Sequence, residues 1–173
     1  MASLVRYAAL LRGVMPTNLK MTALKAAFEA AGFVDVKTVL ASGNVLFSAP
    51  RQTTVKLAKK AEATLSAELG QTFPTFIEPV EELRALIEDN PWKRWKVPAA
   101  AKRVVTILRT VPRAAVELPV HHHEGVTIWG RDERRVFTTY LPGHGPVFMA
   151  LLQKTFGDDI TTRTWDTLAK LTR

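Results

Sequence analysis

The chain has 173 residues, of which 47% are hydrophobic, so it can bury the core of one sizeable domain or two small ones. It contains no cysteine, which excludes disulfides, thiolate metal sites and a cysteine nucleophile. The formal net charge is +8 and is uneven, because residues 92–173 hold 14 basic and 7 acidic side chains, a net charge of +7. A basic half of this kind indicates an anionic partner, or else only a solvated surface.

The N-terminal segment, MASLVRYAALLRG, has an apolar run of only a few residues and lacks a signal-peptide cleavage site. No stretch of the chain approaches the roughly 20 apolar residues of a membrane span. We therefore expect a soluble, cytoplasmic protein that has no membrane partner.

Hydrophobic periodicity and turn residues predict a β-α-β-β-α-β order for residues 4–78. The expected elements are a strand over 6–11, a helix that Thr22 caps and Gly32 ends, strands over 34–40 and 44–48 around a turn at 41–43, a helix over 54–69, and a strand over 73–77. Pro74 places the last strand at a sheet edge. This is the split βαβ, or ferredoxin-like, pattern, in which the first and third strands are central neighbours.

The rest of the chain predicts a second, more basic unit. A helix over 80–89 ends at Asn90-Pro91, and the connector PWKRWKVPAAAK follows it. The further expected elements are a strand over 103–109, a turn or short helix over 111–119, a hairpin of 125–129 and 135–141 around 130–132, a helix over 146–156, a strand over 160–163, and a helix over 165–171 capped by Thr164. The predicted fold is α+β, with a ferredoxin-like unit over 1–90 and a smaller α/β unit over 91–173, packed as one globule.

Topology predicts that the loop over 13–20 and the turn over 41–44 meet at one edge of the first sheet. The helix after the loop begins at this edge, and a helix N-terminus carries free N–H groups and positive potential. Arg12 and Lys20 add charge, so this edge is a candidate anion site. It is not a P-loop, because the spacing from Gly13 to Lys20 is wrong and Pro16 has no N–H.

The same region resembles an uncharacterised, largely bacterial family, domain of unknown function 1697. The matching residues are Arg12-Gly13, Lys20-Met21, Gly32-Phe33 and Ser42-Gly43-Asn44, and the Asn90-Pro91 boundary and the tail TTRTWDTLAKL also fit. Val14-Met15-Pro16-Thr17 replaces an asparagine and paired glycines of the family pattern, and Thr164 stands where asparagine is usual. The resemblance implies an α+β fold with ferredoxin-like elements and no established activity.

Two motifs invite a catalytic or metal interpretation. A nucleophilic Ser42 would need a histidine base, but every histidine lies at 121–123 or 144, so a hairpin turn or a polar ligand contact is the better reading. His121 and His123 share a face of an extended segment, with Glu124 or His144 as a possible third ligand. No recognised ligand spacing supports a metal site there, and we expect neither a metal nor a cofactor.

The connector PWKRWK combines indole rings with cations, as single-stranded nucleic-acid sites do, although its tryptophans can equally pack on the core. An RNA-recognition motif would share the first unit's fold and would place aromatic residues on the central strands, where Tyr7 and Phe47 lie. The basic consensus of that module is absent. The paired carboxylates at 81–82 and 158–159 have no partner base, so no catalysis is assigned to them.

These observations favour a protein that binds an anionic ligand, either nucleic acid or a phosphorylated small molecule, at the edge formed by 12–20 and 41–44. One alternative is a small-molecule enzyme that uses the same edge, and another is a structural or assembly protein. Near the C-terminus, an arginine and a tryptophan either complete a site or fix the last helix. The candidate ligand-binding residues are Arg12, Asn18, Lys20, Ser42, Gly43, Asn44, Arg163 and Trp165.

Overall fold

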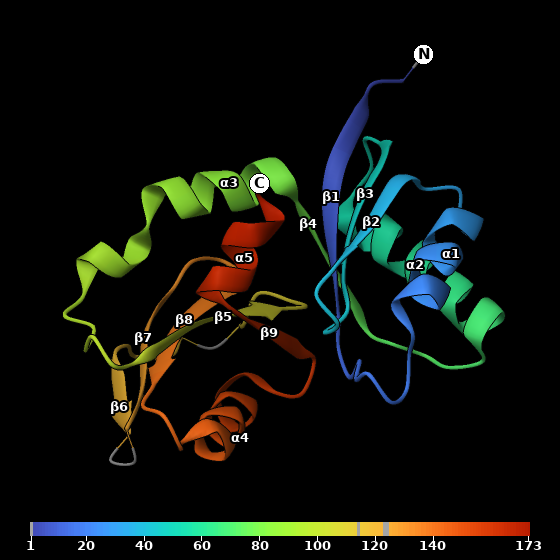
Figure 1. Cartoon of the computed structure of the whole chain (residues 1–173). Helices are drawn as coiled ribbons and strands as arrows, with labels where there is room; N and C mark the ends of the chain where they lie inside the picture. The colour runs from blue at the N-terminus through green and yellow to red at the C-terminus, as the bar shows by residue number, and fades with distance from the viewer. Residues whose placement is uncertain (1, 114, 123–124) are drawn as a thin grey trace. The chain divides into compact units, whose positions relative to one another are not determined.

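The computed structural model describes residues 2–113, 115–122 and 125–173. The chain divides into two compact units, a first unit of residues 1–88 and 169–173 and a second unit of residues 89–168. Each unit combines an antiparallel sheet with helices, which confirms the predicted α+β fold (Figure 1).

The first unit holds a four-stranded sheet in the order β2-β3-β1-β4. Its elements are β1 (Leu4–Leu11), α1 (Met21–Ala30), β2 (Val34–Val39), β3 (Asn44–Pro50), α2 (Thr54–Leu69) and β4 (Thr75–Pro79), followed by α3 (Val80–Asp89). The strands β1 and β3 are the central neighbours, and β3 runs antiparallel to both β1 and β2. The strands β1 and β2 therefore run in the same direction, as the split βαβ pattern requires.

Helices α1 and α2 lie on one face of this sheet, where their apolar stripes meet the inward residues of the strands (Figure 1). In α2 the stripe is Leu57, Ala61 and Leu65, all buried at helical spacing. Tyr7 and Phe47 stack in the same core, with ring centroids 5.6 Å apart, and are 2% and 0% exposed. Because these rings are buried, the central strands do not present an aromatic platform for RNA.

Two local predictions in the first unit were wrong. Lys20, and not Thr22, is the N-cap residue of α1, and Thr22 lies inside the first turn. The last strand begins at Thr75, so Pro74 precedes it, although β4 does lie at the sheet edge. At Pro74 a tertiary contact competes with local propensity: Arg12 donates from its backbone N–H to Pro74 O at 2.9 Å, which holds Pro74 beside the end of β1.

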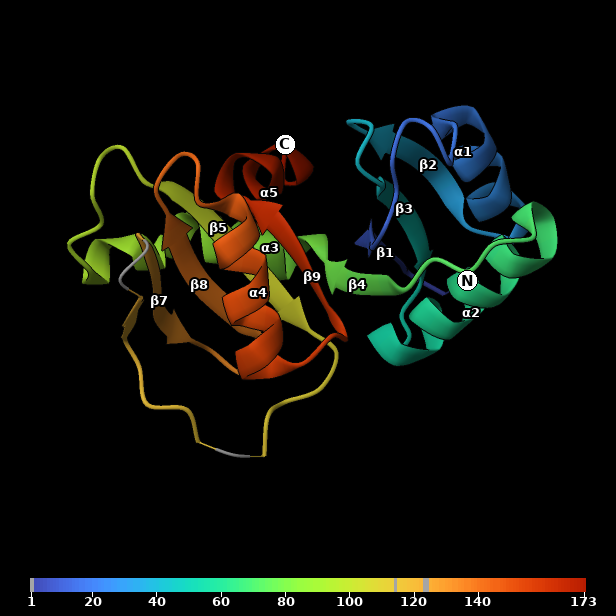
Figure 2. The ribbon, with the colours of Figure 1, turned by 90° about the horizontal axis from the view of Figure 1, so that it is seen from below.

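The second unit holds a five-stranded sheet in the order β6-β7-β8-β5-β9. Its elements are the short 3-10 helix η1 (Pro91–Arg94), β5 (Lys102–Leu108), β6 (Val120–His122), β7 (Val126–Arg131), β8 (Arg135–Tyr140), α4 (Gly145–Phe156), β9 (Ile160–Thr164) and α5 (Trp165–Leu171), whose last turn falls in the first unit. Helix α4 lies across one face of this sheet, where it buries Phe148 and Leu152 (Figure 2).

Several predictions for this unit need correction. Between 111 and 119 the described residues form no helix, and the short strand β6 at 120–122 was missed. Gly130 and Arg131 belong to β7, so the hairpin turn begins at Asp132, whose Oδ1 accepts a hydrogen bond from Arg135 N at 3.1 Å. The cap of α5 was right, because Thr164 Oγ1 accepts from Thr167 N at 3.3 Å. In the part of the chain described, no helix is both long and apolar enough to cross a membrane.

Candidate functional site

The loop after β1 and the turn before β3 meet at one edge of the first sheet. Leu10 is paired with Asn44, and Leu11 donates from its backbone N–H to Gly43 O at 2.9 Å. A methyl group on Gly43 would lie 2.8 Å from Val14 Cγ2, so the turn and the loop are in direct contact. The convergence predicted from the topology is therefore present.

Glycine is required at the centre of the turn. Gly43 has φ +82°, a conformation that costs other residues roughly 1–2 kcal/mol, and it is buried against Val14 and Leu11. Any side chain here would add overlap to that backbone cost. The Gly43 candidate is therefore a position of close approach, where only its backbone can contribute to a site.

Asn44 closes the turn with its side chain. The side chain is fully buried, and Nδ2 donates to Val39 O and to Ser42 Oγ, both at 3.0 Å. Ser42 itself is exposed at the surface of the turn. Asn44 therefore stabilises the hairpin turn, whereas the Ser42 hydroxyl is accessible to solvent.

The side chain of Asn18 likewise stabilises the loop through hydrogen bonds to its backbone. Its Nδ2 donates to Gly13 O and its Oδ1 accepts from Met15 N, both at 2.8 Å. The backbone turns at the same place, because Met15 O accepts from the N–H groups of Asn18 and Leu19. Leu19 is buried and anchors the loop in the core of the first unit. The loop is therefore fixed at several points, and Asn18 serves its conformation.

The N-terminus of α1 lacks a cap. Lys20 is the N-cap residue with extended backbone, it makes no side-chain cap hydrogen bond, and the first turn contains no acid. Within the described residues, the N–H groups of residues 21–23 have no acceptor and the side chains of Arg12 and Lys20 have no partner. Lys20 is exposed and Arg12 is half-buried. This edge therefore carries uncompensated positive potential.

The other two candidates, Arg163 and Trp165, belong to the second unit. Arg163 is only 9% exposed in β9 and donates from Nη1 to Thr161 Oγ1 at 3.0 Å and to Thr162 O at 2.8 Å. Burial lowers the pKa of Arg163 from its ordinary value to about 10, so it stays charged at neutral pH. The Arg163 side chain therefore makes these hydrogen bonds within β9.

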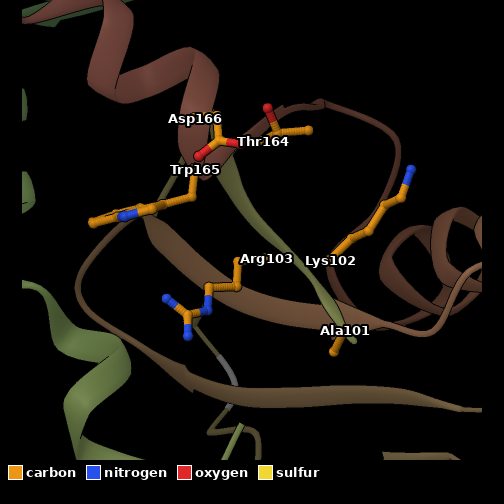
Figure 3. A pocket seen from close by; sticks show the side chains of 6 residues that line it. All are labelled: Ala101, Lys102, Arg103, Thr164, Trp165 and Asp166. Atoms are coloured by element: carbon orange, nitrogen blue, oxygen red, sulfur yellow. The ribbon is translucent and has the colours of Figure 1, made fainter. Parts of the chain in front are cut away.

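Trp165 lines a pocket of about 430 Å³ that the sequence did not predict (Figure 3). The pocket forms where the first residues of β5 lie beside the junction of β9 and α5, and its lining residues are Ala101, Lys102, Arg103, Thr164, Trp165 and Asp166. Two basic residues at the start of a strand, Lys102 and Arg103, do not by themselves indicate a pocket in the sequence. Only the register of β5 against β9 brings them beside Trp165.

The connector tryptophans pack within the second unit. Trp92 is 3% exposed and makes edge contacts with Phe137 and Trp165, at centroid distances of 5.7 Å and 5.9 Å. Trp95 is half-buried and stacks on Trp129 at 6.2 Å. The connector therefore supplies core contacts, while Lys93 is exposed.

No group of three metal-ligating side chains occurs among residues 2–113, 115–122 and 125–173. His121 is exposed, and its Nδ1 lies 3.3 Å from Thr127 Oγ1. Of the other possible ligands that the sequence suggested, His123 and Glu124 lie outside the described residues, and His144 precedes α4 as its N-cap residue.

Comparison with known proteins places the chain in a family. The profile of the family described as "Protein of unknown function (DUF1697)" matches residues 4–137. A solved structure, that of the conserved bacterial protein SP0830 from Streptococcus pneumoniae, is similar with a TM-score of 0.70 and 19% sequence identity, over 98% of this chain and 97% of that one. At that identity the likeness concerns the fold alone. No curated protein matches. Since the matching profile covers most of the chain, this protein belongs to the DUF1697 family of proteins of unknown function.

Proposed function

We propose that this protein binds a phosphate-bearing ligand at the edge of the first sheet, where the loop over 13–20 meets the turn over 41–44. The observation that carries the proposal is the uncapped N-terminus of α1, which follows a loop that carries Arg12 and Lys20, two basic side chains that have no partner among the described residues. Phosphate is the anion that helix N-termini and lysine or arginine side chains most often bind together in proteins.

The site is held in place before any ligand arrives. Asn18 fixes the loop through Gly13 and Met15, and Asn44 fixes the turn through Val39 and Ser42. A rigid site loses little conformational entropy on binding, which raises affinity for a given set of contacts. Asn18 and Asn44, whose side chains already bond the loop and the turn, therefore act as positioning residues. The ligand would contact Arg12, Lys20 and the N–H groups of α1.

The loop sequence restricts how the phosphate is held. Val14-Met15-Pro16-Thr17 contains no glycine, Pro16 has no N–H, and the N–H of Met15 is already bonded to Asn18. A backbone cradle like that of a P-loop is therefore absent from this loop. Recognition would depend on the two side chains and the helix terminus, so it would be electrostatic and sensitive to salt.

The test measures binding of labelled single-stranded RNA, single-stranded DNA and duplex DNA by fluorescence anisotropy across a salt series. A site that neutralises phosphates gives a linear fall of log affinity with log salt, and losing one phosphate contact reduces the slope by about 1. We expect Arg12→Ala and Lys20→Ala each to weaken binding several-fold and to flatten this slope. Inorganic phosphate and a nucleoside monophosphate serve as competitors, to separate a nucleic-acid ligand from a small one.

The chain offers matched controls. Arg51 follows the opposite end of β3, and Lys56 lies in the first turn of α2, a helix that the Thr53 side chain caps. Arg51→Ala and Lys56→Ala remove the same charges from the same unit without touching the proposed site. Equal losses of affinity in the control and the test variants would show that only the net charge of the protein matters. An anion affinity that Arg12→Ala and Lys20→Ala leave unchanged would refute the proposed site.

A further inference from the structure

The pocket at the start of β5 exists because two strand pairings have different lengths. Strand β5 pairs with β8 from Lys102 onward, but with β9 only from Val104, whose partner is Thr164. At Trp165 the chain leaves the sheet and begins α5. The flank of β5 at residues 101–103 is therefore left without a neighbouring strand, and the pocket occupies that position.

One wall of the pocket is aromatic and fixed. The Trp165 indole is half-buried and meets the buried Trp92 ring edge-on, at 5.9 Å and an interplanar angle of 88°. Figure 3 shows the Trp165 and Arg103 side chains extending to the same side of β5. Arg103 Cζ lies 5.9 Å from the centroid of the Trp92 ring, so a cation–π contact orients the guanidinium as well.

The remaining walls supply charge. Lys102 extends to the other side of the strand, below Thr164 (Figure 3). Lys102 and Arg103 are exposed, and neither makes an ion pair within the described residues. Asp166, in the first turn of α5, adds one carboxylate that also has no ion-pair partner there. The pocket thus combines an indole ring, two available cations and one hydrogen-bond acceptor.

We infer that this pocket binds a nucleoside monophosphate whose base carries N–H donors. The base stacks on Trp165, since base–aromatic stacking contributes about 1–3 kcal/mol per base. The phosphate contacts Arg103, which extends to the same side of β5 as Trp165, and the Asp166 carboxylate, which only accepts hydrogen bonds, receives N–H groups of the base edge. The volume of about 430 Å³ lies at the small end of the range for ligand pockets, which fits one nucleotide.

This site is separate from the proposed phosphate site in the first unit, and the inference does not rest on it. All six lining residues belong to the second unit, whereas Arg12 and Lys20 belong to the first. The two proposals therefore predict loss of binding from two different sets of variants.

The test is calorimetric titration of the full chain with guanosine monophosphate, with guanosine and inorganic phosphate as separate probes. We expect the monophosphate to bind at least tenfold more tightly than either part alone. Arg103→Ala should weaken it several-fold, Lys102→Ala should weaken it less because that side chain extends to the other side of β5, and Asp166→Asn should weaken it while leaving phosphate binding unchanged. Lys154→Ala on α4 and Arg113→Ala are the matched controls, because both side chains are exposed, belong to the second unit and lie outside the pocket.

Replacing Trp165 risks the packing on Trp92, so Trp165→Phe is used with a thermal unfolding measurement. A folded Trp165→Phe variant with weaker binding supports stacking. The inference is overturned if guanosine monophosphate does not bind at millimolar concentration, or if the control variants weaken it as much as Arg103→Ala does. It is also overturned if Arg12→Ala and Lys20→Ala abolish nucleotide binding while Arg103→Ala leaves it intact, a result that would instead support the site in the first unit.

Discussion

Gly43 and Val14, which lie on the turn and on the loop of the proposed site, are in such close contact that a methyl group on Gly43 would lie 2.8 Å from Val14 Cγ2 and 2.9 Å from Val14 Cβ. The contact joins two segments that are far apart in sequence. The close approach is possible because Gly43 has no Cβ.

Gly43→Ala should lower the free energy of unfolding more than Gly13→Ala does. Both glycines have φ +82°, so both substitutions incur a left-handed backbone cost of about 1 kcal/mol or more. Only Gly43 adds overlap with Val14, since nothing lies within 4 Å of a Cβ on Gly13. That overlap should add about 1–3 kcal/mol. Urea unfolding of the two variants gives the difference directly, and equal losses would show that the contact with Val14 is unimportant.

Asn44→Ala should destabilise the first unit by about 1–3 kcal/mol, because it removes a buried amide that donates two hydrogen bonds within the turn. The amide of Asn44 bonds Val39 O and Ser42 Oγ from a fully buried position. Ser42→Ala removes one acceptor at the exposed surface of the same turn and should cost much less. Chemical denaturation of both variants checks this order. A larger loss from Ser42→Ala would mean that the hydroxyl, and not the amide, closes the turn.

The sequence predicts most of the fold because the first unit is locally consistent. Helix α2 was predicted at its true bounds, since Thr53, the stripe of Leu57, Ala61 and Leu65, and Gly70 all indicate the same helix. Lys20 shows the limit of such reasoning. It has no capping side chain, so the start of α1 is set by the loop that Asn18 holds, which local pattern does not reveal.

The candidate site was predictable only in part. The edge at 12–20 and 41–44 follows from topology alone, because the order of strands brings the ends of β1 and β2 together. The pocket lined by Lys102, Arg103 and Asp166 was missed, since it depends on where the pairing of β5 and β9 stops. Strand register is a tertiary property, and no local signal in these residues specifies it.

Trp92→Phe should cost about 1–2 kcal/mol, because the smaller phenyl ring keeps part of the aromatic contact area that the indole buries. Trp92→Ala should cost about 3–5 kcal/mol. The Nε1 atom of Trp92 is buried and has no hydrogen-bond partner among the residues that the structure describes, so losing that N–H carries no cost of its own. Thermal unfolding of the two variants tests the order. Equal destabilisation by both would show that the N–H group, rather than the ring, matters.

The stabilisation associated with Arg163 should not change with pH near neutrality. Burial lowers the pKa of Arg163 to about 10 in the folded state, below the ordinary value that the unfolded chain keeps. Between these two values the unfolded chain binds more protons, so the contribution of this group to stability rises with pH there and is constant below. The difference in unfolding free energy between the wild type and Arg163→Gln should be flat from about pH 6 to about pH 9. A difference that changes across that range would show that Arg163 is coupled to a group that titrates within it.

The central claim is that an anion binds at the edge between the loop and the turn of the first sheet. The most direct measurement is a titration of the isotopically labelled chain with inorganic phosphate at low salt, followed through the amide chemical shifts. We predict saturable shifts at Gly13, at residues 20–23 and at Gly43, with residues near Arg51 and Lys56 unmoved. Saturable shifts that leave residues 20–23 unmoved, or no saturable shifts at all, would contradict the claim.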